Sequence, residues 1–276
     1  MESISIVHVK IKKAGSTELL NADDELAVEE PLEIQLLYGN KNNRIQKALS
    51  VTMRTPGNDE ELALGFLFTE GIIQHRRQVV NPPASFAANK VLVTLIENEE
   101  PLLQNAERNF YTTSSCGVCG KASIEAIRTV SCYKNPADET RLKAALFYCL
   151  EDELRKKQAL FETTGGLHAS ALFDLEGNFI MLREDVGRHN ALDKIIGTAF
   201  LNDDLPLDNK ILLLSGRASF ELIQKAAMAG IRIVAGVGAP SSLAVQLAKD
   251  AGITLIGFLR SKGFNIYSGE RRIIAG

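Results

Sequence analysis

Residues 210–259 decide the fold of this chain, and they read KILLLSGRASFELIQKAAMAGIRIVAGVGAPSSLAVQLAKDAGITLIGFL. In this stretch, three short apolar segments alternate with two segments of helical periodicity. The expected strands are Lys210–Ser215, Ile231–Ala235 and Ile253–Leu259, and the expected helices are Ala218–Ala229 and Pro240–Ala251. Gly230 and Gly252 follow the helices, at the position where glycine commonly ends one. Continuous apolar strands separated by helices indicate a parallel sheet covered on both faces, and hence a layered α/β fold.

The segments before this stretch extend the sheet. Ala169–Phe173 and Phe179–Arg183 flank a turn at 174–178 and predict an antiparallel hairpin, so we expect a mixed sheet with flanking helices. Further toward the N-terminus, Leu32–Leu37 and Ile45–Met53 predict two strands joined by a turn at Tyr38–Asn43. The alternation in residues 91–97 predicts another strand.

A helix start is expected between these N-terminal strands. Asn58 can act as the cap, Glu61 can complete a capping box, and acidic residues occupy the first turn, where the helix dipole favours them. The helix is expected to run through Thr69 and to stop near Gly71. We therefore predict a smaller N-terminal αβ subdomain over residues 1–110 and a C-terminal α/β subdomain over residues 111–276.

Composition and charge narrow the classes of function. The chain has 31 Lys and Arg against 34 Asp and Glu, a net charge of −3, which argues against bulk electrostatic binding of nucleic acid. The start, MESISI, lacks a basic segment followed by a long apolar run, and the apolar stretches are too short to span a bilayer. We expect a soluble cytoplasmic protein that does not bind membranes, in which the four cysteines are reduced.

The most distinctive local motif is a pair of cysteines in residues 114–127, SSCGVCGKASIEAI. Cys116 and Cys119 lie among serines and glycines, and good helix formers follow from Lys121, so the thiols are expected just before a helix N-terminus. A helix dipole and a nearby cation lower a thiol pKa and favour the nucleophilic thiolate. The motif therefore favours a reactive thiol, although two buried structural cysteines in a turn remain an alternative.

Metal and redox alternatives for the pair are weaker. A structural zinc site needs a second pair of ligands, and Cys132 and Cys149 are too far apart in sequence to provide it. A zinc deaminase needs Pro before the first cysteine and Glu two residues after a histidine; Ser115 takes the place of the proline, and none of the four histidines has that Glu. We expect no zinc. A thioredoxin-like redox pair stays possible, but the expected strand before it is missing.

Two further segments are candidates for handling an anion. Thr163–His168 contains consecutive glycines that can point backbone N–H groups at an anion, although a simple turn before a strand is at least as probable. Arg183–Asn190 places five ionisable groups in a short segment between a strand and a helix. The alternative to a ligand site is that Asp185 caps the helix and the rest of the segment is a solvated face.

The ends of the three expected parallel strands carry Gly, Ser and basic residues. They are Ser215–Ser219 with Arg217, Val237–Ser242, and Phe258–Gly263 with Arg260 and Lys262. Because α/β proteins bind ligands at the carboxyl ends of such strands, these loops together predict a site for an anionic ligand. The aromatic Phe258 is suited to stack on a base.

Six motifs occur in an order that resembles the formate dehydrogenase accessory sulfurtransferase (FdhD) family, from about Pro31 to Ile273. They are Met53–Gly57, the Cys116/Cys119 loop, Thr164–His168, Arg183–Lys194, Ser215–Phe220 and Ala239–Val245. The resemblance implies a C-terminal region like the cytidine deaminase fold without its zinc, and a homodimer. It also implies that sulfur passes from a cysteine desulfurase to molybdenum bis(molybdopterin guanine dinucleotide), before that cofactor is inserted into formate dehydrogenase.

The resemblance also assigns residues. It places the persulfide on Cys116, with Cys119 as its partner in the loop, and the cofactor-binding segment on Phe258, Leu259, Arg260, Ser261, Lys262 and Gly263; Arg217 joins them from the strand-end argument. This chain has Gly238 where the family usually has Ser. The alternative to a sulfurtransferase is a non-catalytic chaperone that binds and presents the cofactor, with structural cysteines.

Overall fold

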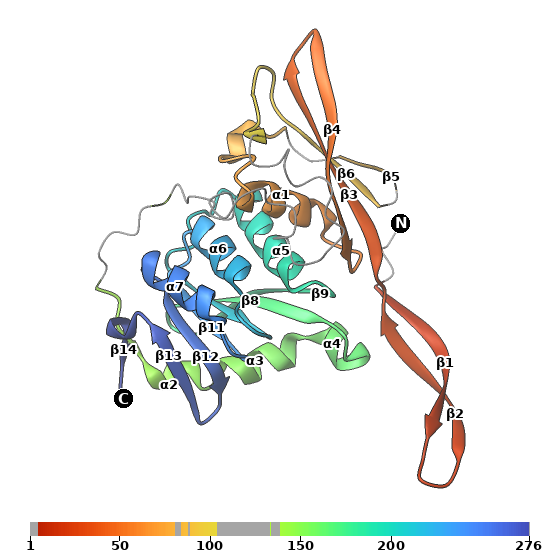
Figure 1. Cartoon of the computed structure of the whole chain (residues 1–276), viewed down its shortest axis with the longest axis vertical. Helices are drawn as coiled ribbons and strands as arrows, with labels where there is room; N and C mark the ends of the chain where they lie inside the picture. Colours follow the sequence, from red (N-terminus) through yellow and green to blue (C-terminus); the bar gives the residue numbers. More distant parts are fainter. Residues whose placement is uncertain (1–4, 81–83, 88, 104–132, 134–138, 276) are drawn as a thin grey trace.

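A six-stranded mixed sheet lies at the centre of the C-terminal half (Figure 1). Its strand order is β13-β12-β11-β10-β8-β9. The strands are β8 (His168–Asp174), β9 (Phe179–Asp185), β10 (Lys210–Leu214), β11 (Ile233–Gly236), β12 (Thr254–Arg260) and β13 (Gly263–Ser268). The structure is a computed structural model that describes residues 5–80, 84–87, 89–103, 133 and 139–275.

The directions of these strands confirm the predicted mixed sheet. Strands β10, β11 and β12 are parallel to one another, whereas β8 runs antiparallel to both β10 and β9, and β13 runs antiparallel to β12. Strand β9 is therefore parallel to β10, β11 and β12. The expected hairpin is β8–β9, and β13 is a strand that the sequence analysis did not predict.

Helices cover the two faces of the sheet. Helices α5 (Arg188–Leu201), α6 (Phe220–Met228) and α7 (Ser242–Asp250) lie on one face, and α2 (Ala144–Phe147), α3 (Leu150–Lys157) and α4 (Ala159–Thr164) lie on the other side (Figure 1). Helix α6 ends before Gly230 and α7 before Gly252, and both glycines have positive φ, 74° and 66°, as the sequence predicted. Each face has its own apolar core: Leu172, Leu212 and Val234 pack under α5 and α6, whereas Phe173 and Leu213 pack with α3.

A second sheet, of order β4-β3-β6-β5, forms the N-terminal region. Its strands are β3 (Glu30–Asn40), β4 (Asn43–Arg54), β5 (Ala84–Ala87) and β6 (Lys90–Thr94). The three strands predicted here are confirmed, but β3 and β4 extend further than expected. They pair as far as Asn40 opposite Asn43, so the predicted six-residue turn is reduced to Lys41 and Asn42.

Helix α1 (Asp59–Thr69) confirms the predicted helix but not its capping box. Asn58 has a left-handed backbone, with φ 57°, and its side chain makes no capping hydrogen bond. The acidic first turn is present, and the Asp59 carboxylate accepts two hydrogen bonds from the Arg54 guanidinium, at 3.0 and 2.9 Å. The prediction was wrong because a left-handed residue directs its side chain away from the N–H groups of the first turn.

Two glycines bring α1 into direct backbone contact with α5. A Cβ atom at Gly65 would lie 1.9 Å from the Asp193 carbonyl oxygen, and one at Gly197 would lie 1.8 Å from that of Glu61. One apolar core consequently extends from β3 and α1 through α5 to the large sheet. The predicted division into residues 1–110 and 111–276 stays a prediction, because its boundary lies outside the described residues.

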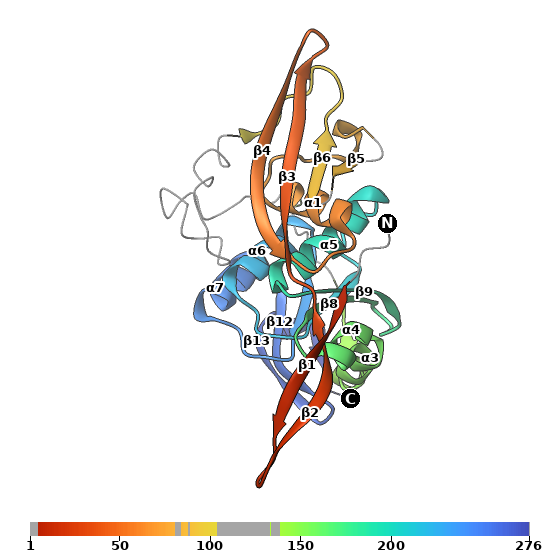
Figure 2. The ribbon, with the colours of Figure 1, turned by 90° about the vertical axis from the view of Figure 1, so that its right-hand side faces the viewer.

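Residues 6–27, for which the sequence predicted no helix or strand, form a ribbon. Strands β1 (Ile6–Ala14) and β2 (Leu19–Ala27) pair antiparallel and project from the body, at the end opposite the tip of β3 and β4 (Figures 1 and 2). The remaining elements are short: β7 (Leu142–Lys143) pairs with β14 (Ile273–Ile274), and η1 (Arg76–Gln78) and η4 (Glu270–Arg272) are single turns. In the part of the chain that the structure describes, no helix is both long and apolar enough to cross a membrane.

Candidate functional site

The carboxyl ends of β9, β10, β11 and β12 meet at one edge of the large sheet, which we call the carboxyl edge. Backbone hydrogen bonds join the loops that follow these strands: Gly238 N donates to Gly216 O (3.0 Å), and Phe258 N donates to Gly238 O (3.2 Å). At the same edge, Ser215 N donates to Ala169 O in β8 (3.0 Å). The strand-end segments expected to act together are therefore neighbours, as predicted.

The predicted cofactor segment is the end of the β12–β13 hairpin. Phe258 has a left-handed backbone (φ 53°), and its side chain is 46% exposed at the carboxyl edge. The other predicted residues differ in exposure: Arg260, Ser261 and Lys262 are exposed, Gly263 is half-buried at the start of β13, and Leu259 is fully buried. Within this segment, the surface available to a ligand thus comes from Phe258 and the turn.

Arg260 and Arg217 point to different surroundings. Arg260 Nη1 donates to Val237 O (2.9 Å) and lies 3.6 Å from Glu151 Oε1 of α3, on the face of the sheet opposite α5 and α6. Arg217 is exposed after β10 and lies against Gly238, where a Cβ atom would be 2.9 Å from Arg217 N. A serine at 238 would therefore require the backbone of Arg217 to move, so Gly238 is matched to the position of this loop.

The predicted catalytic residues Cys116 and Cys119 lie outside the described residues, as does Cys132. Cys149, between α2 and α3, is described and exposed. Among the residues that the structure describes, no three His, Cys, Asp or Glu side chains are close enough to hold a metal ion. Because three cysteines are not included in that statement, the absence of zinc stays a prediction.

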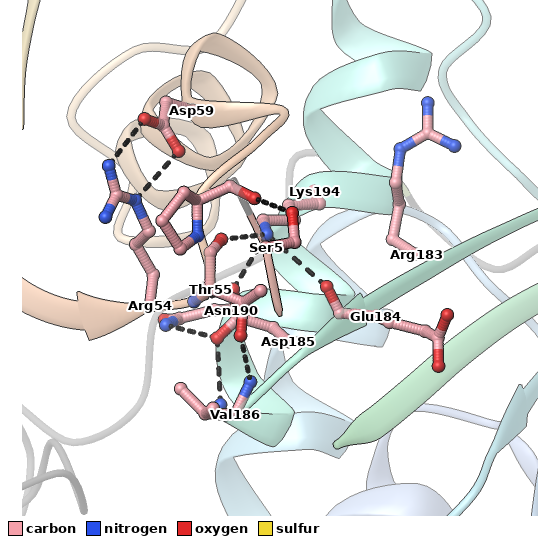
Figure 3. A network of polar contacts seen from close by, with 12 residues as sticks. Ser5, Arg54, Thr55, Asp59, Arg183, Glu184, Asp185, Val186, Asn190 and Lys194 are labelled. Carbon is pink, nitrogen blue, oxygen red and sulfur yellow. Dashed lines mark hydrogen bonds and ion pairs between the residues drawn. The ribbon is translucent and has the colours of Figure 1, made fainter. Parts of the chain in front are cut away.

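Asp185, within the segment expected to handle an anion, is the centre of a buried polar network (Figure 3). Its carboxylate is 0% exposed and lies 2.7 Å from Lys194 Nζ. It also accepts hydrogen bonds from Thr55 N (3.2 Å), Gly187 N (2.8 Å) and Asn190 Nδ2 (3.0 Å). The interpretation of Asp185 as a helix cap is therefore wrong, because Gly187 is the N-cap of α5 and the Asp185 carboxylate joins the residues before α1 to β9 and α5.

Two more ion pairs lie around the contact between α1 and α5, one between β9 and α1 and one between α6 and α5. Arg183 donates to both carboxylate oxygens of Glu61, from Nε at 2.6 Å and from Nη2 at 2.9 Å. Lys225 of α6 lies 2.9 Å from Asp193 Oδ2 and donates to Thr69 Oγ1 at 2.8 Å. Burial raises the pKa of Asp193, while Lys225 and Thr69 act in the opposite direction. Sequence reasoning missed Asp193 and Lys225, because the two residues meet only through the packing of α5 on α6.

Two histidines and an arginine lie at the carboxyl edge beside this network. His168 begins β8, and a Cβ atom at Gly216 would lie 3.5 Å from its Nδ1. His189 Nε2 lies 3.5 Å from Ser219 Oγ. Burial, and then the positive charge of Arg188, lower the pKa of His168, with Asp185 opposing them. Burial, followed by Lys225, Arg188 and His168, lowers the pKa of His189 to about 3, so both rings are neutral at pH 7.

Comparison with known proteins identifies the family. The model of the FdhD/NarQ family matches residues 27–274. The chain belongs to the FdhD/NarQ family. This confirms the resemblance stated from the motifs. The match begins at Ala27, the last residue of β2, so the rest of the β1–β2 ribbon lies before the matched residues.

Relatives of this FdhD/NarQ family member match nearly all of it. "Sulfur carrier protein FdhD" of Mycobacterium tuberculosis is 45% identical over 277 residues, covering 96% of this chain and 98% of the relative. The protein of the same name from Streptomyces coelicolor is 49% identical, with 91% and 89% covered. That from Sulfurisphaera tokodaii is 40% identical, with 98% and 100% covered.

A solved structure shares the fold. The crystal structure of a candidate formate dehydrogenase accessory protein from Desulfotalea psychrophila has a TM-score of 0.73 and 23% identity, covering 98% of this chain and 100% of that one. At this identity the likeness shows the fold alone, and it confirms the mixed α/β architecture. The likeness to cytidine deaminases stays a prediction.

Proposed function

We propose that this FdhD/NarQ family member is a sulfur carrier that serves formate dehydrogenase. The single observation that supports this most is the match to proteins named as sulfur carriers, at 40–49% identity over almost the full length of both chains. In this proposal, a cysteine desulfurase supplies the sulfur and Cys116 receives it as a persulfide. The acceptor is the molybdenum of bis(molybdopterin guanine dinucleotide) before that cofactor enters formate dehydrogenase.

The loading step is a thiol exchange. The Cys116 thiolate attacks the terminal sulfur of the persulfide on the desulfurase, so a new S–S bond forms on Cys116 and the old one breaks. The electron pair of the broken bond stays with the desulfurase cysteine, which leaves as a thiolate. No external oxidant or reductant is needed, because the sulfur keeps its oxidation state throughout.

Delivery of sulfur as sulfide requires two electrons, and Cys119 is the proposed source. Its thiolate attacks the inner sulfur of the Cys116 persulfide, forms a Cys116–Cys119 disulfide and expels hydrosulfide to the acceptor. A thiol reductant then restores both cysteines. The two residues have different roles: Cys116 carries the sulfur, and Cys119 releases it.

The carboxyl edge supplies chemistry that suits a guanine dinucleotide. Phe258 offers an exposed aromatic face for a purine, and Arg217 and Lys262 are exposed cations within the adjoining loops. An acidic chain can bind an anionic ligand at such a local group of cations, even though its net charge is −3. The proposed contacts of the cofactor are therefore Arg217 and the exposed residues of the 258–263 segment.

The test is persulfide mapping on the three cysteines that the proposal treats differently. Purified protein is incubated with a cysteine desulfurase and cysteine, and mass spectrometry locates the added sulfur. Cys116→Ala should lose the persulfide and fail to activate formate dehydrogenase, because the attacking thiolate is lost. Cys119→Ala should acquire the persulfide but release it poorly. Cys149→Ala, at an exposed thiol between α2 and α3, is the matched control and should behave like the parent protein.

Two outcomes would contradict this assignment. A persulfide on Cys119 of the parent protein, with none on Cys116, would reverse the two roles. Activation of formate dehydrogenase by Cys116→Ala, without any bound sulfur, would replace the carrier with a chaperone that only presents the cofactor.

A further inference from the structure

Four polar side chains gather where α5 and α6 begin, at the carboxyl edge of the sheet. Arg188 and His189 are the first two residues of α5, Ser219 is the N-cap of α6, and His168 lies against Gly216 in the loop between them. The contact between Ser219 Oγ and His189 Nε2, at 3.5 Å, connects the two helices. The sequence had placed His168 and Arg188 in two separate candidate anion segments, and the fold brings them to one place.

Two buried polar atoms in this area have no hydrogen-bond partner among the described residues. They are Arg188 Nε and Ser170 Oγ. Ser170 is 1% exposed, and it points to the same face of β8 as His168, which is the face that α5 covers. An unsatisfied buried donor costs about 1–3 kcal/mol, and more when it is charged, so folding alone does not explain these two.

The charges around Arg188 are already paired with one another. Asp185 is bound to Lys194, and Lys225 is bound to Asp193. Two further carboxylates are recorded nearby: Glu221 Oε2 lies 3.9 Å from His189 Nε2, and Glu70 Oε1 lies 3.9 Å from Lys225 Nζ. Both imidazoles are neutral at pH 7, and Arg188 forms no ion pair with a carboxylate of the described residues.

We propose that Arg188, His168, His189 and Ser219 form a binding site for a phosphate-class anion. A guanidinium presents a planar set of N–H donors that fits two phosphate oxygens. Neutral imidazoles and a hydroxyl donate further hydrogen bonds. The first turns of α5, with 14 residues, and α6, with 9 residues, add backbone N–H groups that have no acceptor within the helix. An anion here also balances the charge of Arg188.

This inference goes beyond the proposed function, which assigns the cofactor to Arg217 and the exposed residues of the 258–263 segment and gives no role to Arg188, His168 or His189. The anion could be inorganic phosphate or the diphosphate of a nucleotide, and the two share the same chemistry at the site. It is also distinct from the exposed segment at 258–263, which offers a ring and surface cations rather than a half-buried arginine.

The test uses inorganic pyrophosphate with the full-length chain, observed by NMR and calorimetry. The protein has only four histidines, so each imidazole Cε1–H signal can be assigned by mutation. Pyrophosphate should shift the signals of His168 and His189, and it should leave those of His8 and His75 unchanged. His8, in the exposed β1–β2 ribbon, and His75, beside η1, thus act as internal controls.

Arg188→Met should weaken pyrophosphate binding about ten-fold or more, because the charge-assisted hydrogen bonds are lost. Arg188→Lys should retain part of the affinity, since the charge remains without the planar donor set. The matched control is Arg271→Met in η4, an exposed arginine beyond the opposite edge of the sheet, which should bind like the parent protein. Since Arg188 makes no hydrogen bond to a described residue, its replacement should not prevent folding.

GDP and guanosine distinguish the two sources of the anion. If a nucleotide diphosphate occupies the site, GDP binds, guanosine does not, and Arg188→Met weakens GDP and pyrophosphate alike. If inorganic phosphate is the ligand, only the inorganic anions depend on Arg188. Equal pyrophosphate affinity for the parent protein and Arg188→Met, or shifts confined to His8 and His75, would overturn the proposal. Persulfide mapping on Cys116 does not depend on this result, so the two proposals can fail separately.

Discussion

Two basic side chains of α5 lie in contrasting surroundings, although they are less than two turns apart. Lys194 is 2% exposed, and its ammonium group contacts the Asp185 carboxylate at 2.7 Å and Thr55 O at 3.0 Å. Arg188 begins the same helix, and its buried Nε has no partner among the described residues. The charge of Lys194 is paired with a carboxylate within the fold, whereas the guanidinium of Arg188 has no such partner among the described residues.

This difference in pairing distinguishes a charge that stabilises the fold from a charge that is available to a ligand. A buried charge is tolerated when a partner and hydrogen bonds offset its desolvation. Lys194, Asp185 and Thr55, which we call the Lys194 cluster, meet this condition. The pairs of this cluster join the residues before α1 to β9 and α5, next to the glycine contact between α1 and α5. In the Arg188 cluster, which consists of Arg188, His168, His189 and Ser219, the recorded contact between elements is the long one between His189 Nε2 and Ser219 Oγ, at 3.5 Å. We therefore assign the first to stability and the second to a ligand.

The largest expected effect is on the free energy of unfolding when the Lys194 cluster is disrupted. Lys194→Met keeps the length of the side chain but leaves the Asp185 carboxylate buried without its cation. Removing one partner of a buried pair costs about 3–5 kcal/mol, and we expect a decrease of that size in the free energy of unfolding, measured by urea denaturation. Lys249→Met, at an exposed position in the last turn of α7, is the control and should change it by no more than about 0.5 kcal/mol. A loss below about 1 kcal/mol for Lys194→Met would break the contrast, because the compensated charge would then not support the fold.

An intermediate effect is expected from a comparison of two arginines. Arg183 binds both oxygens of Glu61, so Arg183→Met should lower the free energy of unfolding by about 1.5–3 kcal/mol. Arg188→Met loses no recorded hydrogen bond, so it should be neutral within about 0.5 kcal/mol or slightly stabilising. Urea denaturation of both variants in phosphate-free buffer measures the difference. Equal losses would show that the charge of Arg188 is balanced within the fold, and the contrast between the clusters would disappear.

The sequence predicted the elements but not which charges would be paired. Strands β10, β11 and β12 could be predicted because their apolar runs, and the glycines that end α6 and α7, are local signals. The Thr55–Asp185 hydrogen bond joins residues 130 positions apart, so it depends on the packing of α1 against α5. Lys194 and Arg188 are both basic residues on one helix, and no local pattern shows which of them meets a carboxylate. The ribbon of β1 and β2 was not predicted, because neither strand contains a buried residue and both lack the continuous apolar runs of the large sheet.

The candidate site, too, could be predicted only in part from the sequence. The strand-end argument correctly predicted that the loops after β10, β11 and β12 would be neighbours, because carboxyl ends of parallel strands share an edge. It could not predict that Arg260 would turn toward Glu151, on the other face of the sheet, since that contact depends on the position of α3. His168 reaches the edge because β8 runs antiparallel to β10 and begins where β10 ends, which requires the strand order of the sheet.

The last expected effect concerns pH and tests whether His189 is held neutral beside Arg188. Its pKa is about 3 in the folded protein, against 6.5 when it is unperturbed. Between these values the unfolded chain binds a proton at this residue that the folded chain does not. The free energy of unfolding therefore falls as the pH decreases from about 6.5 toward 3, and His189 causes no loss above about pH 6.5. The expected slope from this residue is about 1.4 kcal/mol for each pH unit. His189→Gln should remove this part of the acid sensitivity, seen in urea denaturation at pH 7 and pH 5, whereas His8→Gln in the exposed ribbon should not. Carboxylates that titrate in the same range are common to all three proteins and cancel in the comparison. If the parent protein and His189→Gln lose equal stability at pH 5, His189 accepts its proton without cost in the folded state, and the electrostatic distinction between the two clusters fails.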